Sequence, residues 1–154
     1  MFKLAVGCDP NAIEYLERLT CHLRTKGYTV EVLETEDPIY ANTAFLVGNA
    51  VANGIYDRGI LICGTGIGMS IAANKVPGIR AALITDVYSA QRAILSNDSN
   101  IACFGALTLG YKNFELLADI WLEEKYNRNT PSEAKVRRID EYDEKWRIAK
   151  ANTF

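Results

Sequence analysis

Residues 60–75 read ILICGTGIGMSIAANK. An apolar run ends at Cys63, three alternate glycines follow at Gly64, Gly66 and Gly68, and an amphipathic helical pattern then begins. This order predicts a buried strand, a tight turn and a helix. Such a turn is expected to point its backbone N–H groups outward, where they form a binding site for an anion. A cysteine beside that site is favoured to ionise, so Cys63 is a candidate nucleophile or base.

The same alternation of strand and helix extends over most of the chain. Because the apolar runs are unbroken, it predicts a parallel sheet covered by helices on both faces, which is an α/β, Rossmann-like, three-layer αβα sandwich with five strands. The predicted strands are 2–8, 28–33, 58–62, 80–84 and 100–104; the predicted helices are 10–26, 40–52, 86–95 and 109–126, with another that follows the glycine turn and ends near 75.

Ligands of such sheets bind beyond the carboxyl ends of the strands. Asp9, residues 63–68 and Asp86 each follow a predicted strand and are therefore expected at that edge.

The C-terminal part of the chain differs from the rest. The 154 residues are predicted to form a single domain, 1–154, with an α/β core at 1–126 and a loop and helix at 127–154. The helical pattern over 132–151 is highly charged and has a sparse apolar stripe that cannot stabilise an isolated helix. We therefore expect this helix to pack on a neighbouring subunit, in a homodimer or a larger homo-oligomer.

Composition excludes several classes of partner. The net charge is −2 and basic and acidic residues are mixed, so we expect neither nucleic-acid nor membrane binding. The apolar runs are too short to cross a bilayer, and residues 2–8 resemble a strand rather than a signal peptide. We therefore expect a cytoplasmic protein with four free thiols. The only histidine is His22 and no Cys-x-x-Cys pair occurs, so no metal site is expected.

The glycine turn has two other interpretations. Gly64-x-Gly66-x-Gly68 differs from G-x-G-x-x-G, lacks the Lys-Ser/Thr of a P-loop, and has no acidic residue placed for a ribose. Dinucleotide binding is therefore a minor alternative. In the other interpretation, the turn only allows close packing between strand and helix, and the cysteine is incidental.

Polar residues near other predicted strand ends favour a binding site. Each of them also has an ordinary structural role. Asp9 and Asp86 are placed to cap helices, Tyr40 to pack as a core aromatic, and Asn97-Asp98 to form a turn.

Several blocks of sequence occur together in a known family. They are Gly7-Cys8-Asp9, residues 63–82, Tyr88-Ser-Ala90, Asn97-Asp98 and Phe104-Gly105, in this order and with near-constant spacing. With them the chain resembles, over nearly its whole length, the ribose-5-phosphate isomerase type B / galactose-6-phosphate isomerase family. Residues 92–98 and 132–136 are most similar to the branch with fungal members and bacterial erythrulose-4-phosphate isomerases.

The resemblance implies a sugar-phosphate aldose–ketose isomerase that needs no cofactor and no metal and works through an enediolate. Cys63 would be the base that moves a proton between the first two carbons. The N–H groups of Gly64, Gly66 and Gly68, with the Thr65 hydroxyl, would hold the enediolate oxygens. Asp9 and Tyr40 would bind sugar hydroxyls, Asn97 would contact the carbonyl end, and Arg138 matches a tail arginine of the family. We also expect Ser96 and Lys135 among the substrate-binding residues. Active sites of this family lie between two subunits.

Four positions depart from the family pattern. Pro10 replaces a histidine that helps to hold phosphate, and Ser96 replaces the histidine that opens the furanose ring. Leu107 replaces an arginine, and Ala134 replaces one of two tail arginines, of which Arg138 matches the other.

These departures bear on the substrate. A tetrose 4-phosphate cannot close a furanose ring because its O4 is esterified, so Ser96 favours a four-carbon substrate. Phosphate usually takes several charge-assisted hydrogen bonds. We expect tail residues to rebuild its pocket; otherwise the substrate carries no phosphate. The candidates are Arg128, Thr130, Ser132, Lys135 and Arg138.

Three other functions remain open. One is ribose-5-phosphate isomerase itself, with another group opening the ring. A second is a non-catalytic partner subunit, as in heteromeric galactose-6-phosphate isomerases, although such a subunit has no need of Cys63 and its glycine turn. The third is a sugar-binding regulator, which would not exchange the substrate's C2 proton with solvent.

Overall fold

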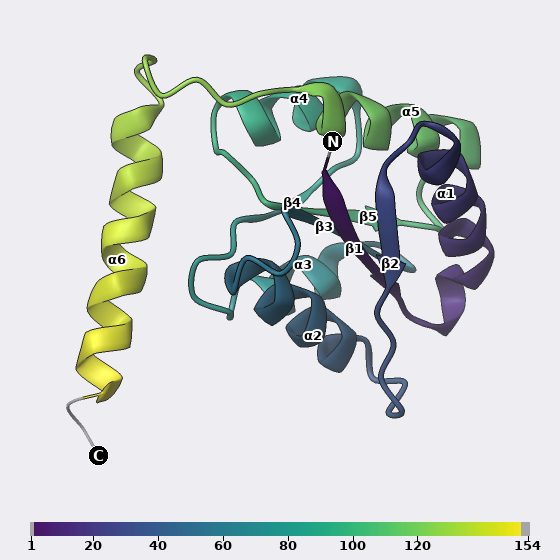
Figure 1. Ribbon diagram of the computed structural model, residues 1–154, viewed down its shortest axis with the longest axis horizontal. Helices are drawn as coiled ribbons and strands as arrows, with labels where there is room; N and C mark the ends of the chain where they lie inside the picture. Colours follow the sequence, from purple (N-terminus) through teal and green to yellow (C-terminus); the bar gives the residue numbers. More distant parts are fainter. Residues whose placement is uncertain (1, 152–154) are drawn as a thin grey trace.

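The computed structural model describes residues 2–151, and its centre is one parallel sheet of five strands (Figure 1). The strand order is β2-β1-β3-β5-β4. The predicted five-stranded parallel sheet is confirmed. The strands are β1 (Lys3–Cys8), β2 (Thr29–Val32), β3 (Arg58–Cys63), β4 (Ala81–Leu83) and β5 (Ile101–Gly105).

Helices cover both faces of the sheet, as the unbroken apolar strands predict. On one face, side chains such as Leu4, Ile60 and Phe104 pack against α1 (Ile13–Thr25), α4 (Val87–Leu95) and α5 (Tyr111–Glu123). On the other face, Leu61, Cys63 and Cys103 pack against α2 (Tyr40–Ala52) and α3 (Ile67–Ala73). Successive residues of a strand point to opposite faces, so Cys63 belongs to the α2/α3 layer.

Element ends differ from the sequence predictions by a few residues. Pro10–Ala12 form a short 3-10 helix, η1, and the α-helix begins only at Ile13. Asp9 caps η1, because its Oδ1 accepts a hydrogen bond from the Asn11 N–H at 2.9 Å. The predicted strand 80–84 shortens to β4 because the Arg80 N–H donates to the side-chain oxygen of Asn100, outside the ladder.

The parallel register separates two edges of the sheet. Gly59 pairs with Ile101 at the amino end of β3, and Cys63 pairs with Gly105 at its carboxyl end. At about 3.3 Å per residue, the six residues of β3 span roughly 16 Å. Residues just before β5 and residues just after β3 therefore lie at opposite edges.

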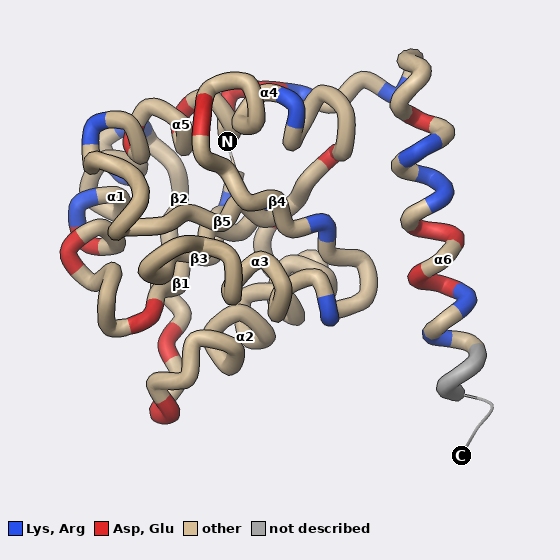
Figure 2. Tube along the Cα trace, turned by 180° about the vertical axis from the view of Figure 1, so that it is seen from behind, with Lys and Arg blue, Asp and Glu red and all other residues tan. Residues whose placement is uncertain are grey.

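Helix α6 (Glu133–Ala151) stands beyond the β4 edge, apart from both helical layers (Figure 1). Polar contacts join it to the loop before β4: Arg80 pairs with Asp140 at 2.8 Å, and the Gly78 N–H donates to Asp143 at 2.8 Å. Val136 is its buried apolar residue. Lys and Arg are interspersed with Asp and Glu along the helix (Figure 2).

The apolar stripe of α6 is largely uncovered, since Tyr142 and Trp146 are 62% and 55% exposed. Packing of this helix on a neighbouring subunit stays a prediction. Within residues 2–151, no helix combines the length and the apolar character that a bilayer crossing requires.

Candidate active site

Cys63 ends β3 with its thiol almost fully buried, at 5% exposure of the residue. The backbone N–H of Gly66 donates a hydrogen bond to the Cys63 sulfur, with an N···S distance of 3.1 Å. The sulfur thus accepts a hydrogen bond from the turn that follows it. This differs from the expectation that all N–H groups of the turn point outward, because the Gly66 N–H points inward.

Gly66 holds that orientation through a backbone conformation that favours glycine. Its φ is 78°, in the left-handed region. A Cβ at this position would also lie 2.6 Å from Leu83 Cδ1 and 2.9 Å from the carbonyl carbon of Phe104. The turn and the core around it therefore require glycine here.

The rest of the turn is fixed by its neighbours and keeps donors free. The Ala106 and Leu107 N–H groups donate to the carbonyls of Cys63 and Gly64 at 2.8 and 2.9 Å. Thr65 is exposed, and its Oγ1 accepts from the Ile67 N–H at 3.3 Å. In the described part of the chain, the N–H groups of Gly64, Thr65 and Gly68 have no protein acceptor. These three donors are available to a ligand.

Tyr40 lies against this turn from the start of α2. A Cβ at Gly68 would lie 2.6 Å from Tyr40 Cζ and 2.9 Å from its hydroxyl oxygen. The ring therefore reaches the turn only because residue 68 is glycine. Tyr40 is 42% exposed, so it forms a wall of the site rather than part of the core.

Asp9 stands at the same edge, directly after β1. Its N–H donates to the Ile62 carbonyl at 3.1 Å, which places it beside the end of β3. Besides capping η1, it lines a cavity of about 230 Å³ with Pro10, Glu34 and Thr43 among others. The structure thus brings Asp9, Tyr40 and the glycine turn to one edge of the sheet.

Ser96 and Asn97 lie at the other edge, since they precede β5. The Asn97 side-chain nitrogen donates to the Arg92 carbonyl at 3.1 Å. Asn97 lines a second cavity of about 570 Å³, together with residues of α4, the β4 segment and α6. Within one chain these two residues do not reach Cys63.

The tail residues are also remote from the turn. Lys135 and Arg138 are exposed on α6, and Arg138 Nε pairs with Glu141 at 3.1 Å. Of the positions that depart from the family pattern, Leu107 lies near the turn: a Cβ at Gly64 would be 3.3 Å from Leu107 Cδ1. Leu107 is 76% exposed and gives the turn an apolar wall where an arginine would supply charge.

The other cysteines are not placed as bases. Burial, aided by the negative charges of Asp9 and Glu34, raises the pKa of Cys8 to about 11. Burial also raises the pKa of Cys103, with a smaller contribution from neighbouring Cys63. Cys21 is exposed on α1, and all four cysteines are free, as predicted.

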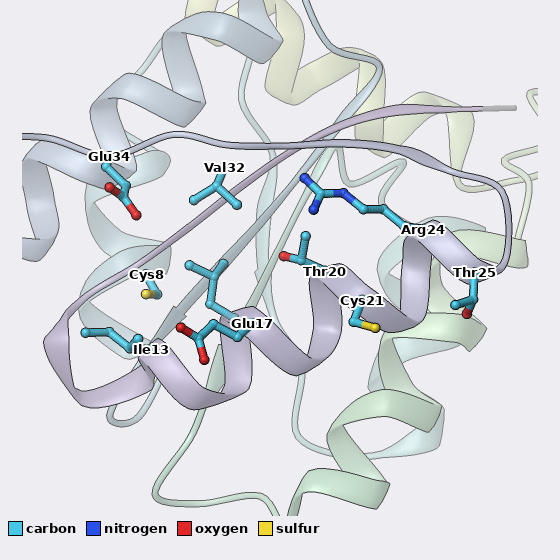
Figure 3. Close-up of a pocket in the computed structure, with 10 residues that line it drawn as sticks. Cys8, Ile13, Glu17, Thr20, Cys21, Arg24, Thr25, Val32 and Glu34 are labelled. Carbon is cyan, nitrogen blue, oxygen red and sulfur yellow. The ribbon is translucent and has the colours of Figure 1, made fainter.

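A larger cavity lies away from this chemistry. It measures about 700 Å³ and is lined by residues of α1 and of the β2 segment (Figure 3). Thr20, on its α1 side, has a buried hydroxyl without a hydrogen-bond partner among the described residues. Neither Cys63 nor the glycine turn lines it.

Sequence reasoning missed Arg92. Its side chain donates to the Ser96 hydroxyl, with Nε at 2.7 Å from Oγ, and it lines the 570 Å³ cavity with Asn97. The sequence carries only part of this signal: residues four apart on a predicted helix share one face, but the rotamer that joins the two side chains does not follow from spacing.

Comparisons with known proteins identify the family of this chain. A model of the ribose/galactose isomerase family matches residues 4–140. The ribose-5-P isomerase B of Listeria innocua is 45% identical over 146 residues, which cover 93% of this chain and 98% of that protein. The D-erythrulose-4-phosphate isomerase of Pectobacterium atrosepticum is 40% identical over 147 residues, covering 93% and 96%.

The fold is shared with solved members of the same group. The structure of the ribose-5-phosphate isomerase B of Clostridium thermocellum matches with a TM-score of 0.87 at 35% identity, covering 94% of this chain and 99% of that one. The sequence resemblance is thereby confirmed. The chain belongs to the ribose/galactose isomerase family and is a sugar-phosphate aldose–ketose isomerase.

Proposed function

We propose that this chain interconverts a tetrulose 4-phosphate and a tetrose 4-phosphate, with Cys63 as the base. The observation that carries the catalytic part is the hydrogen bond from the Gly66 N–H to the Cys63 sulfur. The thiolate takes a proton from the carbon next to the carbonyl, and the electron pair moves onto the carbonyl oxygen to give an enediolate. The proton of the neighbouring hydroxyl moves to this oxygen, and the Cys63 thiol returns its proton to the former carbonyl carbon as the other oxygen becomes the new carbonyl.

The N–H groups of Gly64, Thr65 and Gly68 stabilise the enediolate. They have no protein acceptor in the described part of the chain, so they are available when the negative charge develops. Preorganised donors of this kind are typically worth about 3 kcal/mol each. Tyr40 and Asp9, at the same edge, bind the sugar hydroxyls.

The four-carbon substrate is supported by Ser96. Its position is the one that the family resemblance assigns to opening the furanose ring, a step in which the ring oxygen, O4 of a pentose, takes a proton. A tetrose 4-phosphate is already open because O4 carries the phosphate. Relatives named for ribose 5-phosphate and for erythrulose 4-phosphate are both similar to this chain, so overall identity does not choose between the two sugars.

The complete site requires two copies of the chain. Cys63 and Asn97 lie at opposite edges of the sheet, about 16 Å apart along β3, so both reach one substrate only if the second comes from another copy. The core, 1–126, then contributes the glycine turn, and a second copy contributes Ser96, Asn97 and the tail cations Lys135 and Arg138. The exposed stripe of α6 supports this assembly.

A substrate panel with cysteine variants tests the proposal. The purified chain is assayed on aldose and ketose phosphates of four to six carbons and on the free sugars, in deuterated water. We expect faster turnover of tetrulose 4-phosphate than of ribose 5-phosphate, with deuterium incorporated at the exchanged carbon. Cys63→Ala abolishes turnover and leaves the melting temperature near that of the wild type, whereas the control Cys21→Ser retains full activity.

Three results contradict the proposal. Substantial turnover by Cys63→Ala removes the thiol from the mechanism. Equal rates on ribose 5-phosphate and tetrulose 4-phosphate remove the argument from Ser96. Binding without deuterium incorporation would indicate a regulator instead of an enzyme.

A further inference from the structure

The Arg92 side chain is held in place by Ser96. Arg92 Nε donates to the Ser96 hydroxyl oxygen at 2.7 Å, and Nη2 donates to the same oxygen. With both lone pairs engaged, this hydroxyl can act only as a donor toward a third group. Arg92 and Ser96 therefore present N–H and O–H donors together and no acceptor. A surface of this kind is suited to an anion.

Arg92 also carries charge that no carboxylate neutralises. The other arginine of the 570 Å³ cavity, Arg80, pairs with Asp98 at 3.0 Å and with Asp140 at 2.8 Å. Arg92 has no carboxylate within ion-pair distance among the described side chains. It is half-buried, so solvent screens its charge less than that of a fully exposed arginine.

The cavity around Arg92 is shared with Asn97, which the proposed function assigns to the substrate. Both residues come from α4 and the turn that follows it. A volume of about 570 Å³ is ample for a four-carbon sugar phosphate. Its polar lining includes Ser89 and Asn74, with Tyr88 and Ile139 as apolar walls.

We propose that Arg92, oriented by Ser96, binds the phosphate group of the substrate, and this inference rests on the proposed function. A group that opens a furanose ring acts at O4, and in a tetrose 4-phosphate O4 carries the phosphate. A guanidinium at Ser96 therefore meets the dianion directly. Charge supplied by Arg92 takes the place of the charge missing at Pro10, Leu107 and Ala134.

The experiment compares Arg92→Gln, Arg92→Lys and the control Arg18→Gln. Arg18 lies on α1, pairs with Glu14 and is remote from the cavity. For each protein, KM and kcat are measured on tetrulose 4-phosphate and on phosphate-free tetrulose, and the dissociation constant of inorganic phosphate is measured by calorimetry. Melting temperatures report whether each variant is folded.

We expect Arg92→Gln to raise KM for tetrulose 4-phosphate and the dissociation constant of phosphate by about ten- to a hundredfold. Its kcat/KM falls much less on phosphate-free tetrulose than on tetrulose 4-phosphate, whereas a merely structural role would lower both equally. For Arg92→Lys, we expect KM and the dissociation constant of phosphate to lie between those of the wild type and Arg92→Gln, because lysine keeps the charge but lacks the planar guanidinium. Arg18→Gln matches the wild type in every measurement.

The outcomes separate the two proposals. If the wild type isomerises tetrulose 4-phosphate while Arg92→Gln binds phosphate as tightly as the wild type, the role of Arg92 is overturned and the proposed function stands. If the wild type binds phosphate through Arg92 but isomerises none of the sugars, the proposed function is overturned. If Arg92→Gln loses activity equally on both tetruloses, Arg92 does not act through the phosphate.

Discussion

The backbone N–H of Gly66 points at the sulfur of Cys63, at an N···S distance of 3.1 Å. Two contacts in the core enforce this relationship, because Leu83 and the Phe104 backbone leave no space for a side chain at residue 66. The donor to the sulfur is thus held by the packing of β4 and β5 behind the turn.

Gly66→Ala tests this link against Gly54→Ala. Both glycines have positive φ, 78° and 70°, but a Cβ at Gly54 meets nothing within 4 Å. Gly54→Ala is expected to lower the free energy of unfolding by about 1–2 kcal/mol, the cost of the left-handed conformation alone. Gly66→Ala is expected to lose about 1–3 kcal/mol more, the cost of overpacking, and to lose activity. Chemical denaturation measures the free energy of unfolding of both variants. Equal losses of this free energy would show that the contacts around Gly66 relax.

Mixing two inactive variants tests whether the site is shared. Cys63→Ala and Asn97→Ala are refolded together in equal amounts, so that half of the dimers contain one chain of each kind. Each mixed dimer then has one intact site, and about a quarter of the wild-type specific activity is expected to return. A mixture of Cys63→Ala and Cys63→Ser is the control and stays inactive. No recovery in the first mixture would contradict a site that takes Cys63 from one chain and Asn97 from the other.

Trp146→Gln tests the exposed stripe of α6. Trp146 is 55% exposed and lies on the face with Ile139 and Tyr142. If this face packs on a second copy, losing the indole weakens association by at least tenfold in the dimer dissociation constant, measured by analytical ultracentrifugation. The control is Arg137→Gln, on another face of the helix, which leaves the constant unchanged. Equal effects of the two variants would exclude the stripe as the interface.

Asp86 gives the expected pH dependence of stability. Hydrogen bonds from the Ser89 backbone N–H and the Thr85 hydroxyl lower the pKa of Asp86 below its usual 3.8. A lowered folded-state pKa stabilises the protein above the unfolded pKa, and this contribution is lost as pH falls through the folded value. Asp86→Ala is therefore expected to lower the melting temperature at pH 7 and to match the wild type more closely below pH 3.8.

Asp86→Asn separates the charge from the cap. Asparagine keeps a hydrogen-bond acceptor without the charge, so this variant keeps part of the stability that alanine loses at pH 7. A gap between wild type and Asp86→Ala that persists undiminished into acid would show that the ionised carboxylate is not what stabilises α4.

Much of the fold follows from local pattern. The predicted helix over 40–52 matches α2, and Asp86 caps α4 through a capping box with Ser89, because apolar periodicity and cap residues act over a few positions. The separation of Asn97 from Cys63 also follows from the sequence, since Asn97 precedes the predicted strand 100–104 and Cys63 follows the predicted strand 58–62. The inward N–H of Gly66 and the contact of Arg92 with Ser96 do not, because each depends on a particular φ or rotamer.

Arg80 joins two parts of the molecule that are far apart in sequence. It binds Asp98, next to Asn97, and Asp140 on α6. The loop and the tail helix are thus held at a set spacing within one chain. If two chains associate through these parts, as proposed, they lose less freedom of motion than they would with an untethered tail.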